Sequence, residues 1–274
     1  MSASEVSLYS HDRSNLEPGK NYPILDVVQL SRSFGGIQAL NGIIFSLDEG
    51  SMLSIIGPNG AGKTTLINVI TGIYTPSSGE IYFKGQNITG LSANAIARLG
   101  IGRTFQLVEP FSSLTVLENV MVGCHTRSRA GMFAVGLRLP SAQKEERQIK
   151  DEAMENLKLI GLEHKAFHSI SSLPLGERKL VGIARTLSMK PKLLMLDEPV
   201  GGLAAHEVER IAELLHKLSD EGLTIIMVEH NMPFVMSISE RVLVLDQGRK
   251  IADGLPDEVR LNPAVIKAYL GEEA

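Results

Sequence analysis

The sequence predicts an α/β fold with a mainly parallel sheet and a helical insert. An apolar, strand-like run at residues 51–56 leads into a glycine-rich loop, and apolar residues at helical spacing follow it. The pattern is mostly helical from residue 116 to about 161, and helices and strands then alternate as far as residue 245. Such alternation is typical of parallel strands joined by crossover helices.

The individual elements follow from local patterns. Strands are expected where apolar or alternating runs are short and bounded by glycine or charged turn residues, and helices where apolar residues recur every three or four positions. The expected strands are 25–30, 42–47, 51–56, 80–84, 192–196, 224–228 and 241–245. The expected helices are 65–71, 92–99, 177–188, 206–221 and a short one from residue 263. The first 22 residues have no periodicity and are interpreted as a loose tail.

Composition narrows the possible functions. The chain has 27 basic and 31 acidic residues and a net charge of −4, so it lacks the basic surplus expected of a nucleic-acid partner. Its single cysteine, Cys124, cannot form an internal disulfide, which favours a reducing compartment. No run approaches the roughly 18 apolar residues of a membrane span, and the polar N-terminus lacks the apolar stretch of a signal peptide. Any membrane role is therefore expected to come through a partner.

The strongest motif is the phosphate-binding loop G-x-x-x-x-G-K-[ST], which lies between the expected strand and helix. Backbone N–H groups of such a loop surround phosphate oxygens, helped by the positive end of the helix. Lys63 supplies a charge at the β- and γ-phosphates, and the Thr64 hydroxyl can coordinate Mg²⁺. The residues expected to bind the nucleotide are Gly57, Pro58, Asn59, Gly60, Ala61, Gly62, Lys63, Thr64 and Thr65.

Two carboxylates follow the apolar strand that ends at Leu196. The strand would bring Asp197 and Glu198 to the sheet edge where ligands bind in α/β folds. Carboxylate oxygens suit Mg²⁺, so Asp197 is expected to hold the metal and Glu198 to polarise the water that attacks the γ-phosphate.

Further motifs make the chain resemble the ATP-binding cassette (ABC) ATPases. Thr104-Phe105-Gln106 resembles the family's Q-loop, and Val228-Glu229-His230 resembles its switch histidine. Phe34 matches the aromatic residue that stacks on adenine. The resemblance implies that Gln106 senses Mg²⁺ and the attacking water, and that His230 contacts the γ-phosphate.

The resemblance also implies an architecture. It is a P-loop NTPase (RecA-like) core with an N-terminal antiparallel β portion and an inserted α-helical subdomain. A single domain is expected over 23–274, with a nucleotide-binding core at 23–106 and 190–274 and the helical subdomain at 107–189. Its cofactors would be ATP and Mg²⁺, and it would lie at the cytoplasmic face of the membrane.

The family's signature loop, ordinarily L-S-G-G-Q, is altered here to Leu173-Pro174-Leu175-Gly176-Glu177. In the family this loop completes the ATP site of the opposite subunit. Pro174 supplies neither a hydroxyl nor an N–H donor, although proline is tolerated in a first helical turn. The next family motif ends in an aspartate that contacts the other subunit, and Ala204 stands in its place. At Pro174 and Ala204 the chain therefore lacks groups that the family uses between subunits.

Finer resemblance indicates the ATPases of bacterial branched-chain amino-acid importers. It rests on four segments: 66–72, 102–106, the long insert after residues 117–119, and the ending at 262–271. The implied partners are a second ATPase subunit, transmembrane permeases and, indirectly, a solute-binding protein, with no nucleic acid. Two alternatives stay open: the ATPase of a lipid or lipopolysaccharide exporter, and a non-transport ABC scaffold for assembling soluble proteins.

Overall fold

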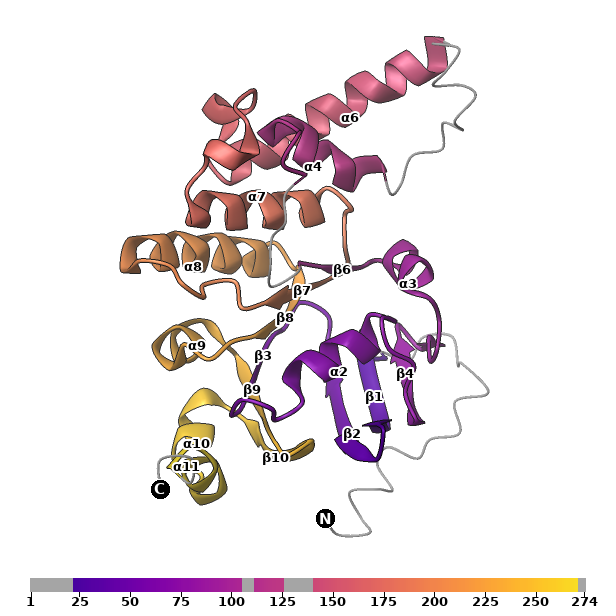
Figure 1. Ribbon diagram of the computed structural model, residues 1–274, viewed down its shortest axis with the longest axis vertical. Helices are drawn as coiled ribbons and strands as arrows, with labels where there is room; N and C mark the ends of the chain where they lie inside the picture. Colours follow the sequence, from indigo (N-terminus) through magenta and orange to yellow (C-terminus); the bar gives the residue numbers. More distant parts are fainter. Residues whose placement is uncertain (1–21, 105–110, 126–139, 271–274) are drawn as a thin grey trace. The chain divides into compact units, whose positions relative to one another are not determined.

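The computed structural model describes residues 22–104, 111–125 and 140–270 (Figure 1). The chain divides into two compact units, which are described separately. The first comprises residues 1–93 and 239–274, and the second comprises residues 94–238. Within the described ranges, no helix has the length and apolar character needed to cross a bilayer.

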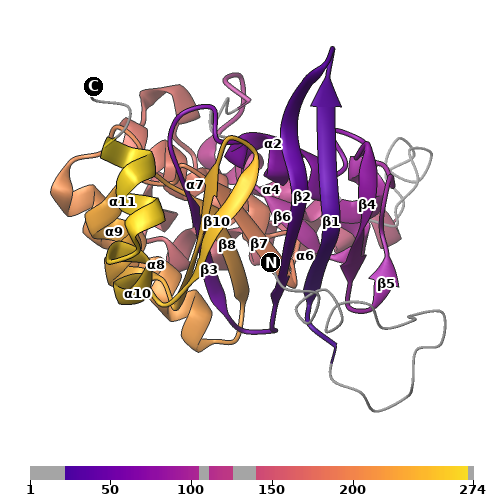
Figure 2. The same ribbon diagram turned by 90° about the horizontal axis from the view of Figure 1, so that it is seen from below.

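An antiparallel sheet forms one part of the first unit (Figure 2). Its strand order is β2 (Ile37–Leu47), β1 (Leu25–Phe34), β4 (Ser78–Phe83) and β5 (Gln86–Asn87). β1 is central, and its Leu25 lies opposite Leu47 on one side and Phe83 on the other. β1 and β2 extend beyond the expected strands because Gly35 and Gly36, both at positive φ, close a hairpin between them.

The other part of the first unit carries the glycine loop. β3 (Met52–Ile56) is entirely buried and pairs in parallel with β9 (Arg241–Asp246). β9 pairs antiparallel with β10 (Arg249–Gly254), a largely polar strand that the sequence pattern did not indicate. The helices of this part are α2 (Lys63–Ile70), α10 (Pro256–Arg260) and α11 (Pro263–Leu270).

The second unit contains three parallel strands in the order β8-β7-β6. β7 (Leu193–Asp197) and β8 (Thr224–Val228) lie at the expected positions and are wholly buried. β6 (Ile101–Arg103) was not expected, because its three residues are too few to show a pattern. α3 (Ala93–Leu99) leads into β6, and α8 (Ala205–Asp220) and α9 (Met232–Ile238) flank β8 in the sequence.

The helical insert of the second unit is confirmed. α4 (Val116–His125), α6 (Pro140–Leu159) and α7 (Leu175–Leu187) pack on one another (Figure 1). Two 3-10 turns, η1 (Glu163–Lys165) and η2 (Ile170–Ser172), connect α6 to α7. α7 begins two residues earlier than expected, because Pro174 occupies the extended N-cap position instead of a helical one. The expected α/β fold with parallel strands and a helical insert is thus confirmed, whereas the boundaries at residues 106 and 190 stay predictions.

Candidate functional site

The glycine loop connects β3 to α2 and is held in place by backbone contacts. Gly57 has φ +146°, and a Cβ there would lie 2.0 Å from the Leu245 carbonyl oxygen. Gly62 has φ +102°, and its Cβ would lie 2.6 Å from the Ala39 carbonyl oxygen. Both positions therefore require glycine, for conformation and for space. The Gly248 N–H also donates to the Ala61 carbonyl at 3.0 Å, so residues from β2 and β9 enclose the base of the loop.

The polar groups of this loop converge at the start of α2. The Lys63 ammonium donates to the carbonyl oxygens of Gly57 at 2.6 Å and Pro58 at 2.8 Å. Asn59, Gly60 and Thr64 are exposed, and α2 has no acidic residue in its first turn. An eight-residue helix with a glycine-rich turn and a lysine at its N-terminus is suited to bind phosphate.

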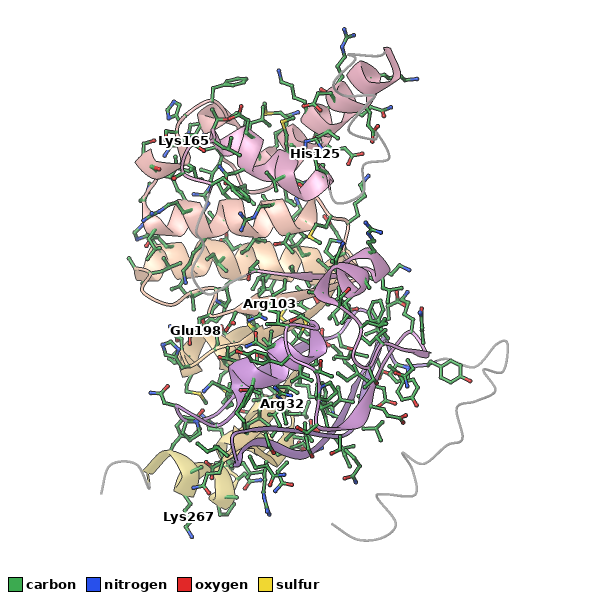
Figure 3. All side chains as sticks on the ribbon, turned by 45° about the vertical axis from the view of Figure 1, so that its right-hand side comes forward. Arg32, Arg103, His125, Lys165, Glu198 and Lys267 are labelled. Atoms are coloured by element: carbon green, nitrogen blue, oxygen red, sulfur yellow. The ribbon has the colours of Figure 1, made fainter. Side chains whose placement is uncertain are left out.

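Phe34 ends β1 and belongs to an aromatic cluster. Its ring meets Tyr74 edge-to-face, with centroids 5.1 Å apart, and is 37% exposed. The Arg32 guanidinium lies 4.5 Å from the centroid of the same ring (Figure 3). The cluster offers a partly exposed aromatic surface of the kind on which a purine can stack. The motif indicates Phe34. It does not indicate that Arg32, two residues earlier in β1, and Tyr74 contact the same ring.

A cavity of about 560 Å³ lies beside the tip of the glycine loop. Asn59 and Gly60 of the loop and Asp246 at the end of β9 are among the residues that line it. Lys267 of α11, labelled in Figure 3, also contributes to the lining. No pattern in the sequence indicates that the C-terminal helix lies this close to the loop.

In the second unit, Asp197 forms a buried ion pair at the end of β7. One carboxylate oxygen accepts a hydrogen bond from Arg103 at 2.9 Å, and the two side chains are 2% and 9% exposed. Arg103 ends β6, which pairs with β7 (Figure 3). The pair was not expected, although Arg103 directly precedes the Q-loop-like motif. Phe105 and Gln106 of that motif lie outside the described residues.

Glu198 follows Asp197 and turns the chain sharply. Its φ is +48°, in the left-handed region that non-glycine residues rarely adopt. Its N–H donates to the Val228 carbonyl at 2.9 Å. Its own carbonyl accepts hydrogen bonds from the Lys179 ammonium at 2.6 Å and from the Gly201 N–H at 3.3 Å. These contacts fix the backbone from which the Glu198 side chain projects.

The structure brings Glu198 and His230 together. The Glu198 Oε1 atom lies 3.8 Å from the His230 Nδ1 atom, and both side chains are partly exposed, at 28% and 61%. A carboxylate beside an imidazole can bind and polarise a water molecule between the two groups and a phosphate. The sequence assigned roles to these two residues from separate motifs, and those roles stay predictions.

Glu229, between the strand and His230, is fully buried. One of its carboxylate oxygens accepts from the Val200 N–H at 2.9 Å. The other accepts from the N–H groups of His230 at 2.9 Å and Asn231 at 3.2 Å. The sequence motif marked Glu229 only as a neighbour of the histidine, because nothing local indicates the hydrogen bond from Val200, 29 positions earlier.

The altered signature loop leads into α7. Leu175 is 42% exposed, and Glu177 forms an ion pair with Lys165 at 2.6 Å (Figure 3). A Cβ at Gly176 would lie 2.2 Å from a carboxylate oxygen of Glu207, so only glycine fits this position without displacing that side chain. Glu207 also accepts from the N–H of Ala204, which caps α8, at 2.9 Å. The loop and the start of α8 are thereby in contact through one carboxylate.

The metal-site residues proposed from the sequence are Thr64, Gln106 and Asp197, of which Gln106 lies outside the described residues. The other two are oxygen donors: the exposed Thr64 hydroxyl and the Asp197 carboxylate. Hard oxygen ligands of this kind fit Mg²⁺. No cluster of three or more histidine, cysteine or acidic residues suited to a protein-only metal cage occurs in the part of the chain that the structure describes. Each of the two side chains therefore offers a donor atom of the type that Mg²⁺ prefers.

Two protein-family models match this chain. Residues 40–201 match the family model described as ABC transporter. The chain belongs to the ABC transporter ATPase family. Residues 249–274 of this ABC ATPase match a second model, described as branched-chain amino acid ATP-binding cassette transporter.

Curated relatives agree along nearly the whole cassette. The ABC ATPase is 41% identical to the high-affinity branched-chain amino acid transport ATP-binding protein BraF of Pseudomonas aeruginosa, over 91% of this chain and 98% of that protein. It is equally similar to LivG of Escherichia coli (strain K12), which has the same description and the same coverage.

Solved structures place the fold in the same family. A nucleotide-free ATP-binding cassette from an ABC transporter superposes with a TM-score of 0.80 at 32% identity, covering 90% of this chain and 99% of that one. The ADP conformation of MJ1267, an ATP-binding cassette of an ABC transporter, gives the same TM-score and identity, with coverage of 91% and 99%. The chain is thus a nucleotide-binding cassette and an ATP hydrolase.

Proposed function

We propose that this ABC ATPase is the ATP-hydrolysing subunit of an importer for branched-chain or related amino acids. The observation that carries the proposal is the match of residues 249–274 to the C-terminal model of branched-chain amino acid cassettes. The 41% identity to BraF and LivG supports it, because this identity extends over 98% of those proteins.

In the proposed mechanism, the amides of the glycine loop and Lys63 hold the β- and γ-phosphates, and Phe34 stacks on adenine. Thr64 and Asp197 supply oxygen ligands for Mg²⁺, and Gln106 senses the ion and the attacking water. When bound, Mg²⁺ offsets charge on the phosphate oxygens. Glu198 accepts a proton from the attacking water, and His230 donates a hydrogen bond toward the γ-phosphate.

The remaining proposal concerns partners. The subunit would pair with a second ATPase, contact permease subunits from the cytoplasmic face of the membrane, and act indirectly on a solute-binding protein. ATP binding would favour the closed pair of ATPases, and hydrolysis would allow the pair to open again. The subunit would therefore convert ATP hydrolysis into a conformational change.

Nucleotide binding is tested first. Calorimetry with the purified chain is expected to show Mg²⁺-dependent binding of ATP, and Lys63→Ala is expected to weaken it at least tenfold. Lys158→Ala is the matched control, because Lys158 is an exposed helix residue paired with Glu155 in the second unit. Equal ATP affinity of all three proteins would remove Lys63 from the mechanism.

Transport is tested on the assembled complex. Affinity capture of the chain from membranes is expected to recover permease subunits, and vesicles containing the complex and its solute-binding protein should accumulate leucine, isoleucine or valine when supplied with ATP. Recovery of a lipid exporter, or of soluble partners only, contradicts the proposed importer.

A further inference from the structure

Lys179 lies in the second turn of α7, the helix that follows the signature loop, and is nearly buried. It is 8% exposed, and its ammonium donates to the Glu198 carbonyl oxygen at 2.6 Å. The same ammonium would be 3.6 Å from a Cβ placed at Gly201, so it lies against the turn that follows Glu198. A lysine is seldom buried unless it has a defined electrostatic partner.

That partner is a pair of carboxylates. Burial lowers the pKa of the Lys179 ammonium, and the nearby charges of Glu229 and Glu198 act in the opposite direction. Glu229 is fully buried and receives hydrogen bonds from Val200 on one side and from His230 and Asn231 on the other. Lys179 and Glu229 therefore place opposite charges around one segment of backbone.

The enclosed backbone is strained. A left-handed conformation at a residue other than glycine is unfavourable and persists only when its surroundings enforce it. At Glu198 the enforcing contacts are those from Lys179, Gly201 and Val228. Without Lys179, the Glu198 carbonyl loses a hydrogen bond from a charged donor.

We propose that Lys179 and Glu229 are positioning residues for ATP hydrolysis. Lys179 holds the Glu198 backbone in the orientation that directs its carboxylate toward water, and Glu229 fixes the Val200 and His230 segments on either side. Because Lys179 belongs to α7, it also connects the helix that follows the signature loop to Glu198. The inference rests on the role proposed above for Glu198.

The test is a mutant cycle on the ATPase activity of the assembled complex. Lys179→Met is expected to lower kcat at least tenfold while leaving the KM for ATP within twofold. Glu229→Gln is expected to act in the same direction, because its amide NH₂ must face the N–H of either Val200 or His230. In a Glu198→Gln background, either substitution should lower the residual rate by less than twofold.

Two exposed residues of the second unit serve as matched controls: Lys158→Met and Glu213→Gln should retain the kcat of the wild-type protein. A merely structural role predicts a different result. Either substitution would then lower kcat by the same factor with and without Glu198→Gln, or would raise the KM for ATP. Either of those outcomes overturns the inference. If Lys179→Met does not fold, the kcat and KM of Glu229→Gln, measured alone and in the Glu198→Gln background, test the inference. Wild-type activity of Glu198→Gln would instead refute the proposed role of Glu198 itself.

Discussion

Glu198 shows how a single residue can combine chemistry with an unusual backbone. Its carboxylate lies near His230, and its positive φ allows the side chain to project from a tight turn after β7. The motif indicated the carboxylate, but nothing in the local sequence indicates left-handed geometry for a glutamate. The conformation is held by a hydrogen bond from Lys179 of α7 and by one from the Glu198 N–H to the carbonyl of Val228 in β8.

Replacing the Glu198 carboxylate by an amide tests whether Glu198 is the general base that accepts a proton from the attacking water. Glu198→Gln keeps the shape of the side chain but cannot accept a proton, so we expect retained ATP affinity and a loss in kcat of about 10²–10⁴-fold. Steady-state ATP hydrolysis by the assembled complex measures kcat, and calorimetry measures the affinity. A rate equal to that of the wild-type protein would exclude Glu198 from proton transfer.

Substitution of Arg103 tests how much its buried ion pair with Asp197 contributes to the free energy of unfolding. Arg103→Met leaves a nearly buried carboxylate without this cation, and we expect the free energy of unfolding to fall by about 3 kcal/mol. Urea denaturation measures the change. Arg98→Met, at an exposed position of α3, is the control and should change it by less than about 0.5 kcal/mol. Equal stability of the two variants would show that the pair contributes little.

Among the elements, α4 depends on its first turn. The Thr115 hydroxyl accepts from the Glu118 N–H at 3.2 Å, and Glu118 accepts from the Thr115 N–H at 2.7 Å. This capping box satisfies donors that the helix leaves unpaired. Hydrogen bonds from the Thr115 N–H and then from its hydroxyl lower the pKa of the Glu118 carboxyl below 4.5.

The capping box predicts a pH-dependent contribution to stability. Because the pKa of Glu118 is lower in the folded state, its contribution is present above pH 4.5 and is lost as the pH falls through the folded pKa. We expect the stability difference between wild type and Glu118→Gln to shrink below pH 4.5, as measured by urea denaturation. In a Thr115→Ala background the dependence should be weaker, because the hydroxyl donor is gone. A difference that is independent of pH contradicts this assignment.

The contact between α4 and α7 depends on one glycine. A Cβ at Gly123 would lie 1.9 Å from the Arg185 carbonyl oxygen, so the helix backbones meet there without a side chain between them. We expect Gly123→Ala to destabilise the protein by about 1–3 kcal/mol through overpacking, despite the better helix propensity of alanine. Thermal unfolding measures the loss. His125→Ala, at an exposed position of the same helix (Figure 3), should have little effect, and equal stability of both variants contradicts close packing.

Strand and helix positions illustrate which elements were predictable. β3, β7 and β8 were found because five consecutive buried residues produce an unbroken apolar run. β6 and β10 were missed for different reasons. β6 is too short to show periodicity, and β10 is polar along most of its length because it pairs on one side with β9. Pairing in space, rather than composition, makes these segments strands.

For the whole molecule, the altered signature loop predicts unequal ATP sites. Pro174 caps α7 without a hydroxyl or an N–H group, and Ala204 lacks a carboxylate. We expect that, with a different ATPase as partner, the site formed by this chain's glycine loop and the partner's signature loop is the more active one. Glu198→Gln should then reduce ATP hydrolysis by the complex more than the equivalent substitution in the partner. Equal losses contradict unequal sites.

The sequence by itself determined the α/β class, the helical insert, the phosphate-binding loop and the two carboxylates at the end of the β7 run. These features are encoded in contiguous residues, where spacing and side-chain type are sufficient. Only the tertiary structure decided that Arg103 pairs with Asp197, that Lys179 binds the Glu198 carbonyl, and that Glu229 joins two loops. The residues of each pair lie 19 to 94 positions apart, so their contacts depend on how the chain packs and leave no local pattern.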